Sequence, residues 1–259
     1  MKLPPISSLK IAAVAIALCA TARAQGPEVP DWALPGSATH RQVPPPKGFH
    51  RATRTVDSPL GIFQGQSDIG GALVPGSDSL DQAAGRYTIN SAGYNIWYNR
   101  DEFRYLWTRM SGDASLAATI TYPNPRGYFD RKVVLVVRQD LDDDSKEAMV
   151  ALHGGGLIHL AGRPAKNEDL KEAFRTRPAG PDDAPTVMPR RIGIEKRGDT
   201  FSLYVSMDGE PLHRIGTPLH LHFSGPYYIG VGFCSHKPAT SDTAVVSDIV
   251  LENKAGAVR

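Results

Sequence analysis

Residues 133–137 read Val-Val-Leu-Val-Val, an uninterrupted apolar run in which four of the five side chains are β-branched. β-branched side chains favour strands, and a strand without polar residues is typical of one that is covered on both faces. We therefore predict that 133–137 form a central strand of a sheet, with other parts of the chain packed on each side.

Shorter strand patterns flank this run from about Asp57 onwards, separated by Gly, Pro, Asn and Asp. In 103–108 (Phe-Arg-Tyr-Leu-Trp-Thr), aromatic residues at every second position alternate with Arg and Thr, which is the period of a half-buried strand. Similar patterns occupy 87–90, 94–98, 116–120, 201–206, 227–233 and 245–251. Many short strands at regular spacing predict an all-β fold, an antiparallel sandwich or barrel.

The stretch from Gly162 to Pro189 departs from this strand rhythm. Asn167-Glu-Asp169 supplies a capping residue and two acids, which suit a helix N-terminus, and Leu170 and Phe174 follow. Prolines at 178, 181 and 185 prevent any extension. We predict a long excursion between strands that carries one short helix and that either covers a site or builds one.

The first 24 residues are typical of a secretory signal peptide. Lys2 and Lys10 supply a positive region, residues 11–20 are a short apolar run, and Ala22-Arg-Ala24 fits a cleavage site. The run is about half as long as a bilayer span requires. We therefore predict a periplasmic or secreted protein whose mature chain does not insert into a membrane.

Cleavage after Ala24 changes the composition that bears on function. The whole chain has 259 residues, 41% of them hydrophobic, with 29 Lys and Arg against 27 Asp and Glu. The mature chain would lose Lys2, Lys10 and Arg23 but no acid, which leaves 26 basic and 27 acidic residues and Cys234 as the one cysteine. This near-neutral balance predicts no nucleic-acid partner, and a single cysteine excludes an intrachain disulfide.

Four segments follow from these signals. We predict a signal peptide at 1–24, a proline-rich N-terminal tether at 25–56, a sandwich domain at 57–253 and a C-terminal tail at 254–259. The second segment contains Pro44-Pro-Pro46, and proline favours extended, solvated backbone that suits a tether or a strap along the domain surface.

The order of several motifs resembles that of a known family. Ser67-Asp-Ile-Gly-Gly-Ala72 is followed by Asp101-Glu-Phe-Arg-Tyr-Leu-Trp107, Arg197-Gly-Asp-Thr-Phe201 and Tyr228-Ile-Gly-Val-Gly232. This order resembles a bacterial exported domain family of unassigned function, regulation-of-enolase-like and associated with TolB-like propellers. The resemblance implies a concanavalin-A-like jelly-roll sandwich of two antiparallel sheets, whose concave face can bind sugars in better-known relatives. It implies no particular activity.

The sequence lacks the mark of a glucanase on this fold. A retaining glucanase needs two carboxylates about 5 Å apart, and the motif Glu-x-Asp-x-x-Glu, which would place them on one strand, does not occur. We predict a non-catalytic module, without a cofactor, that binds a carbohydrate or cell-envelope polymer. Two alternatives stay open: a glycoside hydrolase of the keto-disaccharide type, and a structural or protein-interaction domain.

Aromatic side chains are the leading candidates for ligand binding, because flat rings stack on sugar rings. We predict that a ligand lies across the concave sheet, stacked on Trp97 or Trp107 and hydrogen-bonded by Arg138, with His153 and His159 near the rim. The alternative for the aromatic rings is the sandwich core, and the alternative for the two histidines is an ordinary place on the surface.

Two further expectations concern exposure. Trp97 has the opposite parity to Tyr94 and Tyr98, so we predict that one of these two sets is exposed. His220 and His222 share one face of a strand, as metal ligands can. Because Leu and Phe occupy the other face of that strand, we predict that the two histidines form a solvated edge.

Metal-binding patterns are weak. Asp142, Asp143, Asp144 and the following Ser145 supply oxygen atoms of the kind that calcium prefers. The spacing of an EF-hand and its distal Glu are missing, so a solvated acidic turn is the favoured interpretation. We predict no metal, with calcium at this turn as the alternative.

Overall fold

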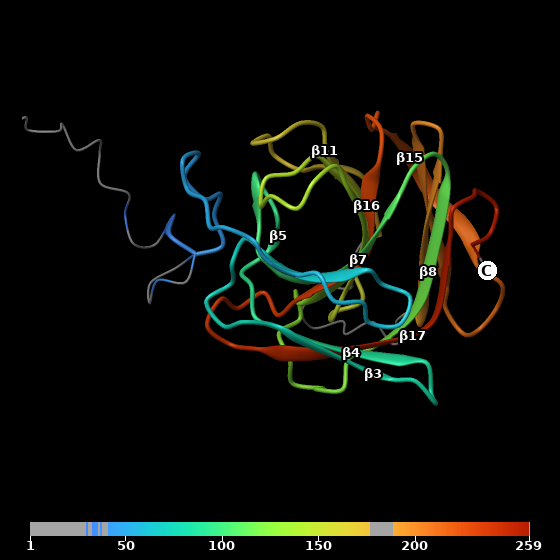
Figure 1. Ribbon diagram of the computed structural model, residues 1–259, viewed down its shortest axis with the longest axis horizontal. Helices are drawn as coiled ribbons and strands as arrows, with labels where there is room; N and C mark the ends of the chain where they lie inside the picture. Colours follow the sequence, from blue (N-terminus) through green and yellow to red (C-terminus); the bar gives the residue numbers. More distant parts are fainter. Residues whose placement is uncertain (1–29, 31–32, 36, 38–40, 177–188, 259) are drawn as a thin grey trace, which may run out of the picture.

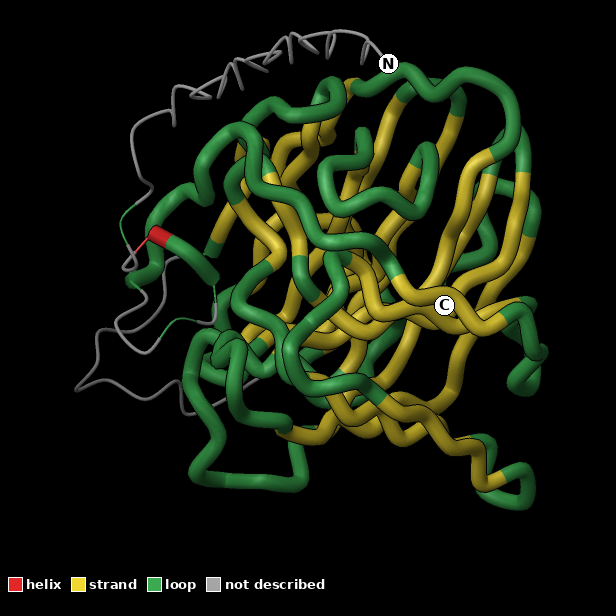
Figure 2. Tube along the Cα trace, turned by 60° about the vertical axis from the view of Figure 1, so that its left-hand side comes forward, coloured by secondary structure: helices red, strands yellow, loops and turns green. Residues whose placement is uncertain are grey.

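The computed structural model describes residues 30, 33–35, 37, 41–176 and 189–258. Over these residues the chain forms seventeen strands and no α-helix, and Ala33 alone has 3-10 geometry (Figure 2). In that part of the chain no helix has the length and apolar character needed to cross a bilayer. The predicted signal peptide lies outside the described residues, as do residues 177–188 of the predicted excursion.

Fifteen of the strands form two large sheets, in which every pairing is antiparallel. The eight-stranded sheet has the order β1 (Arg54–Val56), β2 (Gly65–Ile69), β7 (Phe103–Met110), β16 (Tyr227–Cys234), β9 (Lys132–Arg138), β10 (Glu147–His153), β11 (Ile158–Arg163) and β12 (Lys171–Arg175). The seven-stranded sheet has the order β15 (His213–His220), β14 (Thr200–Ser206), β13 (Arg191–Arg197), β8 (Ala114–Thr121), β17 (Asp242–Glu252), β4 (Arg86–Ser91) and β3 (Ser77–Asp81). The short hairpin of β5 (Ile96–Trp97) and β6 (Arg100–Asp101) stands apart from both.

The two sheets pack face to face as a jelly-roll sandwich, which confirms the predicted all-β fold of two antiparallel sheets. Figure 1 shows β7, β16 and β11 curving around the side on which β5 lies, while β15, β8, β17 and β4 run around the outside. The eight-stranded sheet therefore has one face against the other sheet and a second, concave face toward the β5–β6 hairpin.

Both faces of β9 are buried, as predicted for residues 133–137. Val133, Leu135 and Val137 belong to the core between the sheets, whereas Val134 and Val136 belong to a second apolar cluster on the concave side. Alternation along the strand sends successive side chains to opposite faces, so an all-apolar strand requires cover on both.

The second cluster fills the concave side of the eight-stranded sheet, which we call the covered face. Its members come from the sheet and from the segments laid over it: Ile69, Ile96, Phe103, Tyr105, Trp107, Val134, Val136, Met149, Ala151, Ala161, Leu170 and Cys234, with Trp97, Leu141 and Tyr228 packed against them. Tyr94 is also fully buried, whereas Trp97 and Tyr98 are half-buried. The prediction that one of these two sets is exposed is therefore wrong, because this face carries a layer of its own.

The predicted short helix in the excursion is also wrong. Residues 171–175 form β12, which pairs with β11 and places Phe174 opposite Leu160. Asn167, the expected helix cap, has a φ of 64° and lies in a turn. The backbone N–H of Leu170 donates to the carbonyl oxygen of Tyr98, at 2.9 Å. Pairing with the open edge of β11 and contact with the β5–β6 hairpin stabilise this conformation more than the weak local helix signals would stabilise a helix.

Residues 41–53 form a strap over the covered face, and β1 follows directly as an edge strand. Arg100 of β6 donates to the carbonyl oxygens of Lys47, at 2.8 Å, and of Phe49, at 2.9 Å. The hydroxyl of Tyr98 donates to the carbonyl oxygen of Gln42, at 3.0 Å. Within the segment expected to be a tether, residues 41–56 thus lie along the domain.

Candidate functional site

Polar side chains occupy both ends of the covered face, with the apolar band between them. On β9 the face begins with Lys132 and ends with Arg138. The register places His153 of β10 opposite Lys132, and it places Glu147 of β10 opposite both Arg138 and Arg163 of β11. Side chains opposite each other on antiparallel strands are neighbours, so lysine and histidine gather at one end and arginine and glutamate at the other.

The arginine end forms a charged quartet of Asp101, Arg138, Glu147 and Arg163. Arg138 Nη1 lies 2.7 Å from Asp101 Oδ2 and also bonds Glu147. Arg163 Nη2 lies 2.7 Å from Asp101 Oδ1, and its Nη1 lies 3.3 Å from Glu147 Oε1. All four side chains are 0% exposed. Asp101 belongs to the β5–β6 hairpin, so the quartet links that hairpin to the eight-stranded sheet.

The two carboxylates of the quartet have different proton affinities. Burial, followed by the nearby charge of Asp101, raises the pKa of Glu147 to about 7. Burial also opposes the charge of Asp101, but the two guanidinium groups outweigh it and hold the pKa of Asp101 below its usual value. A raised and a lowered carboxyl side by side is the combination that glycoside hydrolysis uses. Here both are sealed from solvent, so the pair binds arginine rather than a substrate.

Three of the five predicted ligand-binding residues meet at the lysine end, which we call the histidine corner. It consists of Trp97, Lys132, His153, His159 and His236. The rings of Trp97 and His159 lie 5.2 Å apart between centroids, and those of His153 and His159 lie 5.1 Å apart. Lys132 Nζ lies 5.7 Å from the centre of the Trp97 ring. The two predicted histidines are 5% and 2% exposed, so the alternative of surface histidines is wrong.

The histidine corner contains polar atoms that find no partner among the described residues. Both ring nitrogens of His153, Nε2 of His159 and Nδ1 of His236 accept or donate no hydrogen bond within that part of the structure. Burial, and after it the charge of Lys132, lowers the pKa of His153 well below its usual value and that of His236 to about 3. At neutral pH these imidazoles are therefore uncharged, each with one N–H donor and one acceptor nitrogen.

An aromatic rim of Tyr128 and Phe129 lies over the histidine corner. The Tyr128 ring lies 5.4 Å from the His236 ring and 4.9 Å from the Phe129 ring. Phe129 is 60% exposed, the largest exposure of the four large apolar side chains exposed in the described structure. The tight turn 154–156 approaches the rim, since Gly155 N–H donates to the carbonyl oxygen of Phe129, at 2.7 Å. The sequence analysis did not identify this rim, although the adjacent aromatic pair was a signal.

Trp107 and Arg138 lie away from this corner. Arg138 belongs to the charged quartet. Trp107 is 6% exposed, donates from Nε1 to Ser67 Oγ at 2.9 Å, and packs edge-on against Tyr228, with ring centroids 5.0 Å apart. The expected groove that joins Trp97, Trp107 and Arg138 is therefore not open: the apolar cluster fills the space between them.

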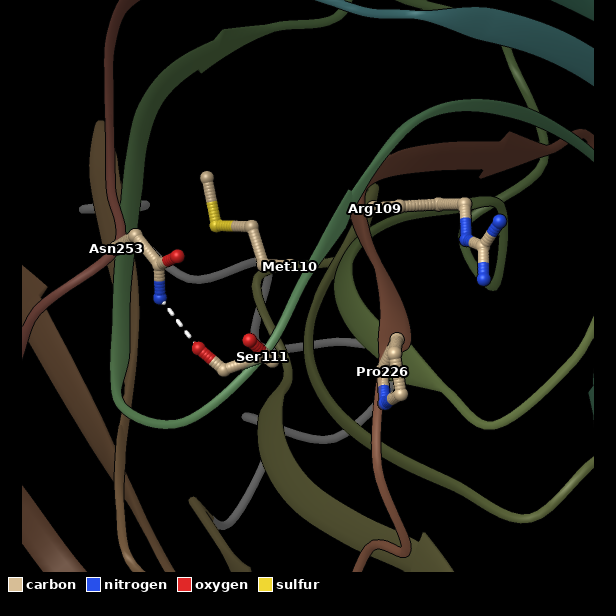
Figure 3. A pocket seen from close by; sticks show the side chains of 5 residues that line it. All are labelled: Arg109, Met110, Ser111, Pro226 and Asn253. Atoms are coloured by element: carbon tan, nitrogen blue, oxygen red, sulfur yellow. Dashed lines mark hydrogen bonds between the residues drawn. The ribbon is translucent and has the colours of Figure 1, made fainter.

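A hollow of about 320 Å³ opens beyond Trp107, at the end of β7. Its lining consists of Arg109, Met110, Ser111, Pro226 and Asn253. Figure 3 shows the Arg109 side chain pointing away from Met110 and Asn253. The Asn253 amide already donates to the carbonyl oxygen of Ser111, at 2.6 Å. The hollow thus presents no aromatic platform, and its amide donor is engaged.

The Asp142–Asp144 turn is paired with cations rather than open. Asp143 Oδ1 lies 2.8 Å from His50 Nδ1, and Asp144 Oδ2 lies 3.8 Å from Arg100 Nη1. Lys166 bonds Asp142 and lies 3.6 Å from Asp144 Oδ1. The donor atoms of His50, Asp143 and Asp144 come within 4.8 Å of one another. Because arginine and lysine neutralise these carboxylates, the arrangement does not favour calcium, which stays a prediction from the sequence alone.

The prediction that His220 and His222 form a solvated edge agrees with the structure. His220 and His222 are exposed, while Leu221 and Phe223 between and beside them are buried. His222 Nδ1 lies 3.1 Å from Asp199 Oδ2. Cys234 is a free, buried thiol, and burial raises its pKa to about 11. Neither feature resembles a catalytic centre, because a thiol with a raised pKa is a poor nucleophile at neutral pH.

The sequence matches no family model and no curated protein, so the resemblance to the TolB-associated family stays a prediction. The fold is similar to several solved structures. A carbohydrate-binding module from Bacillus subtilis is 13% identical over 69% of this chain and 92% of the module, with a TM-score of 0.45. A β-glucanase catalytic domain from Podospora anserina is 13% identical over 72% of this chain and 84% of the domain, with a TM-score of 0.42.

A third similar structure is a functionally unknown protein from Saccharomyces cerevisiae. It is 16% identical over 70% of this chain and 97% of that protein, with a TM-score of 0.47. Since proteins on one fold differ in activity, the function has to be argued from the side chains of this chain.

Proposed function

We propose that this protein is an exported, non-catalytic module that binds a glycan or cell-envelope polymer at the aromatic rim. The observation that carries the proposal is the Phe129 ring, 60% exposed beside Tyr128 and free to stack on a sugar. Lys237 Nζ lies 5.2 Å from the centre of the Tyr128 ring and supplies a charged donor at the same place. Ring and donor together are what a sugar face and its hydroxyls require.

The proposed binding site lies at one end of the eight-stranded sheet rather than across its concave face. The sequence analysis places the ligand across the concave face, but that face is occupied by the strap, the β5–β6 hairpin and the second apolar cluster. The loop that carries Tyr128 and Phe129 joins β8 to β9 and is mostly exposed. A polymer can therefore lie over the rim without any movement of the cover.

The sealed quartet supports a binding role over hydrolysis. Asp101 and Glu147 lie together as a carboxylate pair on the covered face, yet both are fully buried and bonded to arginine. A glycosidase must bring its acid and its nucleophile to the glycosidic bond. The filled concave face also favours the alternative of a structural or protein-interaction domain, which would predict no glycan affinity at the rim.

Binding to a panel of cell-envelope and plant polysaccharides, measured by affinity electrophoresis, tests the proposal. We expect retardation of the wild-type protein in at least one gel, and at least tenfold weaker retardation of Phe129→Ala, since truncating an aromatic anchor commonly costs more than about 1.4 kcal/mol. Leu73→Ala is the matched control, because Leu73 is also an exposed large apolar residue, at 50%. Equal retardation of Phe129→Ala and wild type overturns the assignment of the rim.

Export is part of the proposal and rests on residues 1–24. Fractionation of cells that express the full chain should place a shortened protein outside the cytoplasm, with its N-terminus at or near Gln25. An uncleaved chain in the cytoplasmic fraction contradicts it, and this outcome leaves the binding test untouched.

A further inference from the structure

We propose that the histidine corner binds the carboxylate of an acidic sugar, so that the ligand at the aromatic rim is a uronic-acid glycan. The inference rests on the proposed function, because it assigns a chemical class to the ligand of that site. It is carried by the juxtaposition of a buried lysine with buried imidazole nitrogens that make no hydrogen bond among the described residues, beneath the half-buried Tyr128 and the exposed Phe129.

Several buried imidazole nitrogens of the corner make no hydrogen bond among the described residues. Buried polar groups in proteins nearly always have hydrogen-bond partners, and those without one indicate a bound water, ion or ligand. Here four nitrogens of three adjacent histidines make no hydrogen bond in the described structure, and one of them, His153 Nδ1, lies 3.4 Å from Asp130 Oδ1. The three side chains are 2–7% exposed. Each neutral imidazole offers an N–H, so the corner presents several donors to one small space.

Lys132 adds a buried amine whose pKa is lowered by burial, so that a nearby anion would stabilise its charged form. Its ammonium group is 2% exposed as a residue and donates to Asn95 Oδ1, at 2.8 Å, and to the carbonyl oxygen of Ile96, at 3.3 Å. Both acceptors are neutral, and among the described residues Lys132 forms no ion pair with an acid. A buried charge is costly unless a counter-charge compensates it. A carboxylate from outside would supply that counter-charge and accept the donors of the imidazoles.

One acid lies at the corner. Asp130 Oδ1 is 3.4 Å from His153 Nδ1, but its side chain is 31% exposed, so solvent screens much of its repulsion. Lys237 at the rim and Arg175 of β12 add positive charge, and both influence the site from exposed positions. The balance of charge around the corner therefore favours an anion.

The corner lies one side chain below the surface. Its outer histidines contact two rings, His159 against Trp97 and His236 against Tyr128, and both of these rings are half-buried. A sugar that stacks on the rim would place a substituent of its ring toward Tyr128 and the His236 ring beneath it. A carboxylate is the sugar substituent that is both anionic and able to accept several hydrogen bonds at once.

Calorimetry with a panel of uronic-acid oligosaccharides, each measured beside its methyl ester, tests the inference. The ester keeps the sugar rings and the carbonyl acceptor but removes the charge and adds a methyl group. We expect the acid form to bind at least tenfold more tightly than its ester to the wild-type protein. Lys132→Met should abolish this preference and leave the affinity for the ester unchanged, while Lys254→Met, at a 66% exposed lysine, should behave as the wild type.

A second variant keeps the inference testable if Lys132→Met does not fold. His153→Leu removes two buried nitrogens that make no hydrogen bond within the described structure, together with the contact to the partly exposed Asp130. Its thermal midpoint should therefore stay close to that of the wild type, while its affinity for the acid form falls at least tenfold. Equal affinities for acid and ester in the wild type, or no binding of either, overturn the inference. If the acid is preferred but Phe129→Ala binds both forms as the wild type does, the histidine corner binds the carboxylate but the aromatic rim is not part of the site.

Discussion

The two acids of the charged quartet, Asp101 and Glu147, contribute unequally to the stability of the fold. Asp101 contacts both Arg138 and Arg163 at 2.7 Å, and it also joins the β5–β6 hairpin to the sheet. Glu147 has a pKa raised to about 7 by burial and by Asp101, so near neutral pH it already carries a proton in a large share of molecules. Removal of each charge should therefore cost different amounts.

We predict that Asp101→Asn lowers the free energy of unfolding by about 3–5 kcal/mol, because two buried guanidinium groups lose their main counter-charge. Glu147→Gln should cost less, about 1 kcal/mol at pH 7, since an amide has the shape of the protonated carboxyl. Urea denaturation measures both, with an unchanged slope as the sign that two-state unfolding persists. Asp81→Asn is the control, at a 50% exposed acid paired with Arg86. An equal loss for both buried variants contradicts this account.

Individual residues at the site were only partly predictable from the sequence. Trp97, His153 and His159 were chosen for their chemistry and do meet, although they come from β5, β10 and the start of β11. Lys132, His236 and Asp101 were not chosen, because each lies in a short polar stretch beside an apolar run, where no spacing indicates a binding site. What brings them together is strand register, which depends on pairings between residues distant in the chain.

Among the strands, those with alternating polar and apolar residues or with only apolar residues were predictable from the sequence. Strands that form only because a neighbouring strand offers a pairing edge were not. The patterns at 116–120, 133–137 and 201–206 became β8, β9 and β14. By contrast, β12 consists of Lys-Glu-Ala-Phe-Arg and is half-exposed, so it shows no strand period of its own. It is a strand because β11 offers it an edge, and the cost of leaving that edge open exceeds its helix propensity.

Strand β16 depends on glycine at a position where the sequence suggests only weak strand propensity. Gly230 lies opposite Trp107 in the β16–β7 pairing. A Cβ built at Gly230 would lie 1.9 Å from the carbonyl oxygen of Leu106, which is backbone and cannot turn aside. The missing side chain therefore permits the close approach of β7 on which Trp107 and Tyr105 are carried.

We predict that Gly230→Ala destabilises the fold by about 3 kcal/mol, because strand β7 would have to shift and the packing of Trp107 against Tyr228 would be lost. Gly48→Ala is the control, since a Cβ at Gly48 meets nothing within 4 Å. Chemical denaturation gives the stability, and near-ultraviolet circular dichroism reports the environment of Trp107. A Gly230→Ala protein as stable as Gly48→Ala would show that the strands can separate without cost.

At the scale of the whole molecule, the cover on the concave face changes where function can lie. A sandwich of this shape offers a hollow face, but here the strap, the β5–β6 hairpin and residues 139–146 and 164–170 occupy it. The fold was predictable because it depends on strand rhythm, and the cover was not, because its segments are irregular loops. This is why the five residues predicted to bind a ligand are buried or half-buried, although the sequence predicted them on an open concave face.

One buried carboxyl that contacts the strap makes the stability of the fold depend on pH. Arg51 of the strap donates to Glu102 Oε1, at 2.5 Å, and the backbone N–H of Tyr94 donates to Oε2, at 3.3 Å. Burial raises the pKa of Glu102 from 4.5 to about 7 in spite of Arg51. An acid whose pKa is higher in the folded than in the unfolded chain contributes stability below pH 4.5 that is lost as the pH rises toward 7.

We therefore predict that Glu102→Gln is more costly at pH 4.5 than at pH 7. Between these values the wild type loses up to about 3 kcal/mol from this group, which the variant cannot lose. The buried histidines oppose this trend in both proteins, because their pKa values are lowered and the unfolded chain takes up their protons below pH 6.5. The informative quantity is thus the difference in unfolding free energy between variant and wild type, measured by urea denaturation at steps of half a pH unit.

Glu210→Gln provides the contrast. Hydrogen bonds from the backbone of Met207 and Asp208 lower the pKa of Glu210 to about 2, so the effect of this substitution should be constant from pH 5 to 7. A Glu102→Gln difference that is flat over the same range would mean that folding does not raise the pKa of this carboxyl.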